Sequence, residues 1–166
     1  MNNGFNKRKG AKTDDYNTSK SAYNLIKEFV PKGITLYDPF FNDGACKQYM
    51  QDVFSSCKVI HEDKDAFSWF PEGVDMVITN PPFSIKYQVL SWLVDKDIPF
   101  MCLLPLTTIA TIKFSKVKNS DQIQFITGST RIKYEREGTK GAANFESAWF
   151  CYKMNLPKDI LIKSMN

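Results

Sequence analysis

The sequence predicts an α/β fold in which a mostly parallel, doubly wound sheet ends in antiparallel strands at its C-terminal edge. Up to about residue 105, short β-prone runs alternate with helical patterns, which is typical of a parallel sheet with helices on both faces. After Asp121, three strand-like runs follow one another with only loops between them, which indicates antiparallel pairing.

The chain of 166 residues has the length of one domain. Residues 1–15 are polar, so we expect a flexible basic arm there and a single domain over residues 16–166. Apolar residues make up 43% of the chain, a globular composition, and no stretch reaches the roughly 20 apolar residues of a membrane-spanning helix. The N-terminus lacks the apolar core of a secretory signal. We therefore expect a soluble cytoplasmic protein with no membrane partner.

The first part of the chain predicts helix, strand, helix and strand. Apolar residues recur at helical spacing over Ser19–Val30, and the Pro31-Lys32-Gly33 sequence ends that run. The β-prone run Ile34–Tyr37 predicts the first strand, and a turn containing Pro, Asn, Asp and Gly separates it from a helix over about Ala45–Phe54. The next strand is expected at Lys58–His61.

The middle and the end of the chain predict further strands around one helix. Apolar runs predict strands over Val74–Thr79 and Pro99–Leu104, and an amphipathic pattern between them predicts a helix over Ser84–Val94. The three strands expected after Asp121 are Gln122–Ile126, Thr130–Tyr134 and Phe145–Tyr152.

The most specific motif is Asn80-Pro81-Pro82-Phe83, directly after the strand at Val74–Thr79. Two successive prolines lack N–H donors and fix φ, so the loop is stiff and its carbonyl oxygens are free acceptors. Asn80 Oδ1 and the Pro81 carbonyl are therefore expected to accept both hydrogens of an amine, such as the exocyclic amine of adenine. Phe83 is expected to stack on the flat base, a contact worth about 1–3 kcal/mol. The alternative is an ordinary Pro-Pro turn with Phe83 in the core.

A second motif follows the first strand: Asp38-Pro39-Phe40-Phe41-Asn42-Asp43-Gly44. In open α/β sheets a cofactor binds at the carboxyl ends of the central strands, where the strand order reverses. Asp38 is expected to take a ligand's ammonium group, directly or through water, and Gly44 allows the backbone to approach the ligand. An ordinary Asn-Asp-Gly turn is the alternative.

The acidic residues Glu62 and Asp63 follow the next strand. Glu62, or else Asp63, is expected to bind the ribose hydroxyls of a cofactor, and a solvated acidic turn is the alternative. His61 is the single histidine and is expected to be structural. The four cysteines lack metal-ligand spacing, so we expect neither a metal site nor a disulfide framework.

The net charge of +4 is mild, but basic residues gather in two segments. The first is in the arm, at Lys7–Lys12. The second is a basic-aromatic segment of four charges and one tyrosine, namely Arg131, Lys133, Tyr134, Arg136 and Lys140. We expect both to contact a nucleic-acid backbone; a solvated surface is the alternative.

These motifs resemble those of the S-adenosylmethionine-dependent amino-methyltransferases, in which a (D/N/S)PP(Y/F/W) loop holds the target amine and a DPFxGxG-like loop holds the cofactor. Asn42 stands where that second loop usually has its first glycine. Tyr16-Asn17-Thr18 resembles the upstream cofactor-contacting segment, with Ser19 in place of its usual proline. The runs NPPFSIK, LLPLTT and ESAWFCYK are similar to small phage-encoded adenine-specific methyltransferases. The resemblance covers about residues 16–160.

The resemblance implies a Rossmann-like class I methyltransferase fold, S-adenosylmethionine as cofactor, and transfer of a methyl group to N6 of adenine in DNA or RNA. It assigns Asn80, Pro81, Pro82 and Phe83 to catalysis. It assigns the cofactor to Tyr16, Thr18, Asp38, Pro39, Phe40, Gly44, Glu62 and Asp63. If the chain is phage-encoded, the host cytoplasm is its expected location.

Other functions remain open. The same loop resembles that of methyltransferases acting on protein glutamine or on rRNA guanine. The third hypothesis is a non-catalytic module that keeps the fold and binds nucleic acid, a protein or the cofactor. Methyltransferases that recognise a DNA sequence usually carry a further domain, for which 166 residues leave no room. A protein partner that supplies target recognition is therefore considered, and the oligomeric state stays open.

Overall fold

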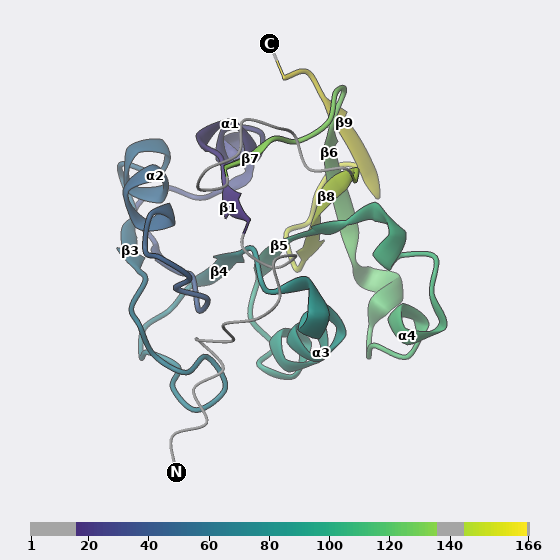
Figure 1. Cartoon of the computed structure of the whole chain (residues 1–166), viewed down its shortest axis with the longest axis horizontal. Coiled ribbons are helices and arrows are strands. Elements are labelled where there is room, and N and C mark those ends of the chain that lie inside the picture. Colours follow the sequence, from purple (N-terminus) through teal and green to yellow (C-terminus); the bar gives the residue numbers. More distant parts are fainter. Residues whose placement is uncertain (1–15, 136–144, 166) are drawn as a thin grey trace.

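A seven-stranded sheet forms the centre of the computed structural model, which describes residues 16–135 and 145–165. Its strands are β2 (Thr35–Tyr37), β3 (Lys58–Ile60), β4 (Met76–Thr79), β5 (Phe100–Pro105), β6 (Gln124–Gly128), β8 (Ser147–Tyr152) and β9 (Ile160–Lys163). They lie in the order β3-β2-β4-β5-β8-β6-β9 (Figure 1). Neighbours are parallel except at β8, which is antiparallel to both β5 and β6. The predicted, mostly parallel sheet is confirmed.

Helices cover both faces of this sheet. The helices α1 (Lys20–Asn24) and α2 (Cys46–Val53) lie on one face, and α3 (Lys86–Asp95) and α4 (Ile112–Ser115) on the other (Figure 1). The short 3-10 turns are η1 (Lys27–Phe29), η2 (Phe83–Ile85), η3 (Leu106–Thr108) and η4 (Ser120–Gln122). Successive side chains of a strand point to opposite faces, so β5 contributes to both layers. Leu103 packs with the α1–α2 core and Leu104 with the α3–α4 core.

The first helix is shorter than predicted. Its N-terminus is capped by Ser19, whose Oγ accepts a hydrogen bond from Ala22 N, and α1 ends at Asn24. The chain then tightens, because Phe29 N donates to the carbonyl three residues earlier, that of Ile26. The apolar face nevertheless continues to Val30, which is buried in the same core. The spacing of apolar residues therefore predicted correctly which side of this segment is buried, but it was wrong in predicting one continuous α-helix.

The C-terminal strands differ from the prediction in two respects. The strand expected at Thr130–Tyr134 is wrong for most of its length: only β7 (Tyr134–Glu135) forms, and it pairs with β1 (Asn17–Thr18) outside the main sheet. The predicted antiparallel section at the C-terminal end of the sheet is confirmed, since β8 runs antiparallel to β5 and β6. The edge is β9, which was not predicted and runs parallel to β6. In the described part of the chain no helix is long and apolar enough to cross a membrane.

Candidate active site

The two predicted motifs meet where the strand order reverses. From β2 the chain proceeds outward to β3, then returns to the other side of β2 and continues through β4 to β5. Asp38 follows β2 and Asn80 follows β4, and these two strands are parallel neighbours with Tyr37 beside Val77. Parallel strands end at the same edge, so both motifs lie at the position where such sheets bind ligands.

Asp38 lies at the centre of a buried hydrogen-bond network. Its carboxylate accepts hydrogen bonds from Thr79 Oγ1 at 2.6 Å and from Phe40 N at 3.3 Å. His61 Nδ1 lies 3.1 Å from the Asp38 carbonyl oxygen, which can only accept, so Nδ1 is the donor in this contact. Burial raises the pKa of the Asp38 carboxyl, and the nearby His61, Thr79 and Phe40 groups partly offset that rise. Asp38 is only 2% exposed, and its contacts with Thr79 and His61 connect the end of β2 to the ends of β4 and β3.

The loop after Asp38 makes a left-handed turn. Asn42 has a φ of 49° and Gly44 a φ of 82°, and Gly44 N donates to the Phe41 carbonyl at 2.8 Å. Asparagine tolerates the left-handed region better than most residues, which explains how Asn42 can replace glycine here. A Cβ on Gly44 would lie 2.7 Å from the end of the Phe41 ring. Gly44 thus serves the turn and a close contact with Phe41.

The upstream segment lies between the two motifs. Asn42 Nδ2 donates to Asn17 Oδ1, and Asn17 Nδ2 donates to Asp43 Oδ2, each at 2.8 Å. On the other side, the Tyr16 carbonyl accepts a hydrogen bond from Asn80 Nδ2 at 2.8 Å. Thr18 is buried. The three segments that the resemblance brings together in function are therefore adjacent in space.

Asn80 is held in one orientation. Because the Tyr16 carbonyl can only accept, its contact fixes the amide nitrogen on that side and Oδ1 on the other. Oδ1 is buried and has no hydrogen-bond partner among the described residues. In the following loop, Ile85 N donates to the Pro82 carbonyl and Lys86 Nζ to that of Phe83, whereas no described donor contacts the Pro81 carbonyl. Of the expected free acceptors, Asn80 Oδ1 and the Pro81 carbonyl remain.

Phe83 belongs to an aromatic cluster of four rings next to Asn80: Tyr16, Phe83, Tyr134 and Phe145. The Tyr16 and Phe83 rings lie nearly parallel with centroids 6.2 Å apart, and Phe145 meets Phe83 edge-on at 5.3 Å. Phe83 also packs against both cores. The site therefore has a flat, apolar wall beside its unpaired acceptor.

The remaining predicted cofactor residues vary in exposure. Glu62 and Asp63 are exposed just beyond β3, whereas Pro39 is buried. Phe40 is partly buried and meets Phe67 edge-on at 6.3 Å. Glu62 and Asp63 thus present acidic side chains at the edge where Asp38 and Asn80 lie.

The basic-aromatic segment is only partly as expected. Tyr134 is not among the surface charges: its ring is buried in the aromatic cluster and its hydroxyl donates to Ser147 Oγ at 2.7 Å. Arg131 and Lys133 are exposed, and Arg131 pairs with Glu146 at 2.5 Å. Ile132 and Tyr134 alternate with these charges and face inward, which produced the strand-like pattern. Arg136, Lys140 and the Lys7–Lys12 arm lie outside the described residues.

Sequence analysis missed three contributors to this site. Thr79 holds Asp38, and the only sequence signal for it was a polar residue ending an apolar strand. Asn17 holds the 42–43 turn, and Lys86 holds the Phe83 carbonyl. Neither residue has a local pattern that indicates its partner.

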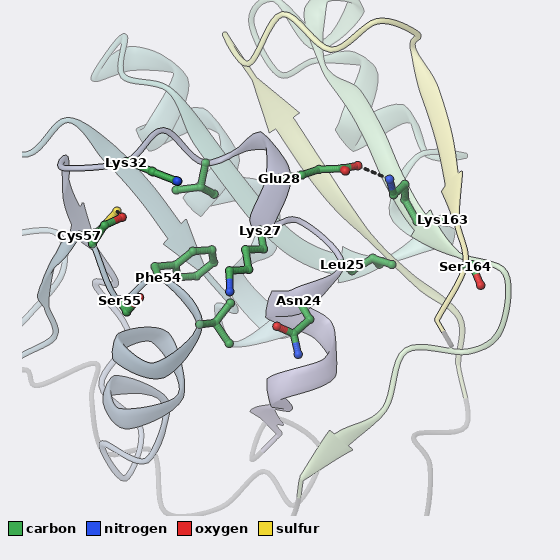
Figure 2. A pocket seen from close by; sticks show the side chains of 13 residues that line it. Asn24, Leu25, Lys27, Glu28, Lys32, Phe54, Ser55, Cys57, Lys163 and Ser164 are labelled. Atoms are coloured by element: carbon green, nitrogen blue, oxygen red, sulfur yellow. Dashed lines mark hydrogen bonds and ion pairs between the residues drawn. The ribbon is translucent and has the colours of Figure 1, made fainter.

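A pocket of about 680 Å³ lies elsewhere, between α1, the end of α2 and β9 (Figure 2). Lys32 and Cys57 line it, and they precede β2 and β3, so it is at the amino ends of these strands. None of the predicted site residues lines it. The pocket is therefore separate from the candidate active site.

The fold resembles those of solved methyltransferases. The type I restriction-modification system methyltransferase subunit from Streptococcus thermophilus superposes with a TM-score of 0.54 at 11% identity, over 93% of this chain and 48% of the subunit. A protein classed as a class I S-adenosylmethionine-dependent methyltransferase from Listeria monocytogenes superposes with a TM-score of 0.49 at 14% identity, over 94% of this chain and 68% of that one. No protein-family model and no curated protein matches the chain.

The chain spans about half the length of the Streptococcus thermophilus subunit. The likeness to the Streptococcus thermophilus subunit shows that this chain has a methyltransferase-like α/β fold, as the resemblance of the motifs implied.

Proposed function

We propose that this chain is an S-adenosylmethionine-dependent methyltransferase that modifies the N6 amine of adenine in DNA or RNA. The observation that carries the proposal is Asn80 Oδ1, a buried acceptor at the carboxyl end of β4 that has no donor within residues 16–135 and 145–165. Leaving such an acceptor unsatisfied costs about 1–3 kcal/mol. A substrate amine that donates to Oδ1 removes this cost, and the Tyr16 carbonyl keeps the oxygen on the correct side.

The loops after β2 and β3 fit the proposed cofactor. Glu62 supplies an exposed carboxylate for ribose hydroxyls, and the turn at Asn42 and Gly44 borders the same edge of the sheet. Because Asp38 is almost fully buried, its role is to hold this loop through Phe40 N and Thr79 rather than to contact the cofactor directly. When bound, S-adenosylmethionine supplies an electrophilic methyl group.

The chain's own residues prepare the amine. Asn80 Oδ1 and the Pro81 carbonyl accept its two hydrogens, which draws the nitrogen lone pair out of conjugation with the ring and directs it outward. Phe83 and its aromatic neighbours support the flat base. Transfer would break the bond between sulfur and the methyl group, whose electron pair would stay on sulfur, and the methylated nitrogen would lose one proton to water, so a dedicated general base is not required.

A nucleic acid is the proposed carrier of the adenine. Near the Asn80–Phe83 loop, Lys86 Nζ lies 4.8 Å from the centroid of the Tyr87 ring and Lys113 Nζ lies 5.8 Å from it. With Arg131 and Lys133, these cations suit phosphate groups around an extruded or unpaired base.

The test is methyl transfer by Asn80→Ala. We expect this variant to lose about 10²–10³-fold in turnover, as for removal of one preorganised polar group from other active sites, while its Kd for S-adenosylmethionine stays within about two-fold. The assay measures tritium transfer to single-stranded DNA, duplex DNA and RNA, each with adenine and with purine, which lacks the amine. Asn24→Ala, an exposed asparagine on α1, is the matched control and should keep full activity.

Three results would contradict the proposal: wild-type turnover by Asn80→Ala, equal transfer to purine and adenine substrates, or cofactor binding without transfer to any nucleic acid. A glutamine-containing peptide is included in the assay. Transfer to the peptide alone would assign the same site to a protein amide.

A further inference from the structure

The strand β9 forms an exposed edge of the sheet and carries apolar side chains on its surface. Ile160 is 61% exposed and Ile162 is 70% exposed, and both point to the α3–α4 side of the sheet beside Phe125 and Thr127. β9 is the last strand of the sheet, and no described strand pairs with its outer side (Figure 1). Uncovered edge strands of this kind pair readily with other strands.

The backbone of β9 divides its hydrogen-bonding groups between two sides. The carbonyls of Asp159 and Lys163 accept hydrogen bonds from Phe125 N and Ser129 N of the β6 segment, each at 2.7 Å. Backbone N–H and C=O groups of successive residues point to opposite sides of a strand. The backbone groups of Leu161 therefore also face β6, whereas those of Ile160 and Ile162 face outward. These outward groups are arranged to pair with an antiparallel strand.

The sequence around Leu161 is complementary to itself. We propose that two copies of this chain associate about a two-fold axis through antiparallel pairing of their β9 strands, centred on Leu161. In this register Ile160 lies opposite Ile162 of the second copy and exchanges both backbone hydrogen bonds with it. Leu161 lies opposite its own counterpart, so apolar side chains meet on both faces.

Charge favours this register over its neighbours. Centring on Leu161 sets Asp159 opposite Lys163 of the second copy, a pair of opposite charges. Centring on Ile160 would set Leu161 opposite Asp159, and centring on Ile162 would set Leu161 opposite Lys163. Asp159 has no ion-pair partner among the described residues, whereas Lys163 pairs with Glu28 of its own chain (Figure 2). Asp159 and Glu28 would therefore flank one lysine.

The strand is short, so the dimer is weak. Four residues of β9 on each side bury less than the roughly 1,200 Å² of a standard stable interface. A Kd on the order of 10–100 µM is expected, and the dimer should form and dissociate with concentration.

Sedimentation equilibrium from about 5 µM to about 1 mM brackets this Kd and is the test. We expect the wild type to shift from monomer to dimer, and Ile162→Lys to stay monomeric, because the two-fold axis brings two added charges to the interface. Ile112→Lys is the matched control: Ile112 is 75% exposed and belongs to α4 rather than to β9, and the variant should dimerise like the wild type. A wild type that is monomeric at every concentration, or a dimer that Ile162→Lys leaves intact, would overturn the proposal.

A charge exchange tests the register. Asp159→Lys should weaken the dimer about ten-fold because it sets like charges opposite one another, and adding Lys163→Asp in the same chain should restore most of the loss. Amide hydrogen exchange gives a second readout, since Ile160 and Ile162 should gain protection as concentration rises. Protection of these amides in a monomer would overturn the proposal, because another part of the same chain would then cover the edge.

Discussion

Asp38 and Asn80 occupy equivalent positions, each one residue past the end of a strand, and these two strands are neighbours. The side-chain oxygens of the two residues differ in their hydrogen bonding. The carboxylate of Asp38 accepts hydrogen bonds from Thr79 and Phe40, whereas Asn80 Oδ1 has no partner in the part of the chain that the structure describes. An unsatisfied buried group costs stability, and such costs are typical of functional sites. This difference separates the residue that maintains the loop from the residue proposed to bind substrate.

The raised pKa of Asp38 gives a prediction for stability. The folded state binds the Asp38 proton more tightly than the unfolded state, so protonation stabilises the fold and this contribution is lost as pH rises through the folded pKa. We expect the free energy of unfolding of the wild type, relative to Asp38→Asn, to fall as pH rises from 3.8, the ordinary value, through the raised one. Urea unfolding of both proteins across this range measures it, and a difference that increases with pH would contradict it.

At the scale of the element, the loop between β2 and α2 depends on two left-handed residues, Asn42 and Gly44. At Gly44 there is a second constraint, because the Phe41 ring occupies the space that a Cβ would need. Phe41 in turn stacks on His61 with ring centroids 5.0 Å apart. A change at Gly44 is therefore transmitted to the buried network around Asp38.

This asymmetry predicts different effects of substitution at the two positions. Asn42→Gly should change the free energy of unfolding by less than about 1 kcal/mol, because glycine adopts the same φ and only an exposed hydrogen bond to Asn17 is lost. Gly44→Ala should destabilise by about 1–2 kcal/mol from the left-handed backbone alone, with a further cost from displacing the Phe41 ring. Chemical unfolding compares the two, and an equal or reversed order would show that the turn is not constrained in this way.

At the scale of the whole molecule, one sheet joins two apolar cores. Leu103 and Leu104 are neighbours in β5, both fully buried, and they face opposite cores. The antiparallel strand β8 is buried along its entire length and likewise contributes to both. The two layers are therefore expected to unfold together.

Leu103→Ala and Leu104→Ala test this coupling. Each should cost about 2–5 kcal/mol and leave a single unfolding transition with an unchanged m-value, because a cavity in either core destabilises the shared sheet. Ile112→Ala, on an exposed side chain, should change stability by less than about 0.5 kcal/mol. Two separate transitions in either leucine variant, followed by fluorescence and circular dichroism, would show that the layers unfold independently.

The sequence by itself determined the alternation of strands and helices, the positions of the Asp38 and Asn80 motifs, and the class of fold. These features are local, since they depend on the period of apolar residues and on prolines and glycines at fixed places. The placement of both motifs at one edge of the sheet also followed, because parallel strands end on the same side.

Only the tertiary structure decided which distant segments meet. The Tyr16 carbonyl orients Asn80 across a separation of 64 residues, and Ser19 Oγ donates to the Lys133 carbonyl across 114. Tyr134 became part of a buried cluster, and β9 became the edge of the sheet, although neither is indicated by its neighbours in sequence. The physical reason is that a local pattern specifies which side of an element is apolar, whereas the partner of that side is set by how the whole chain packs.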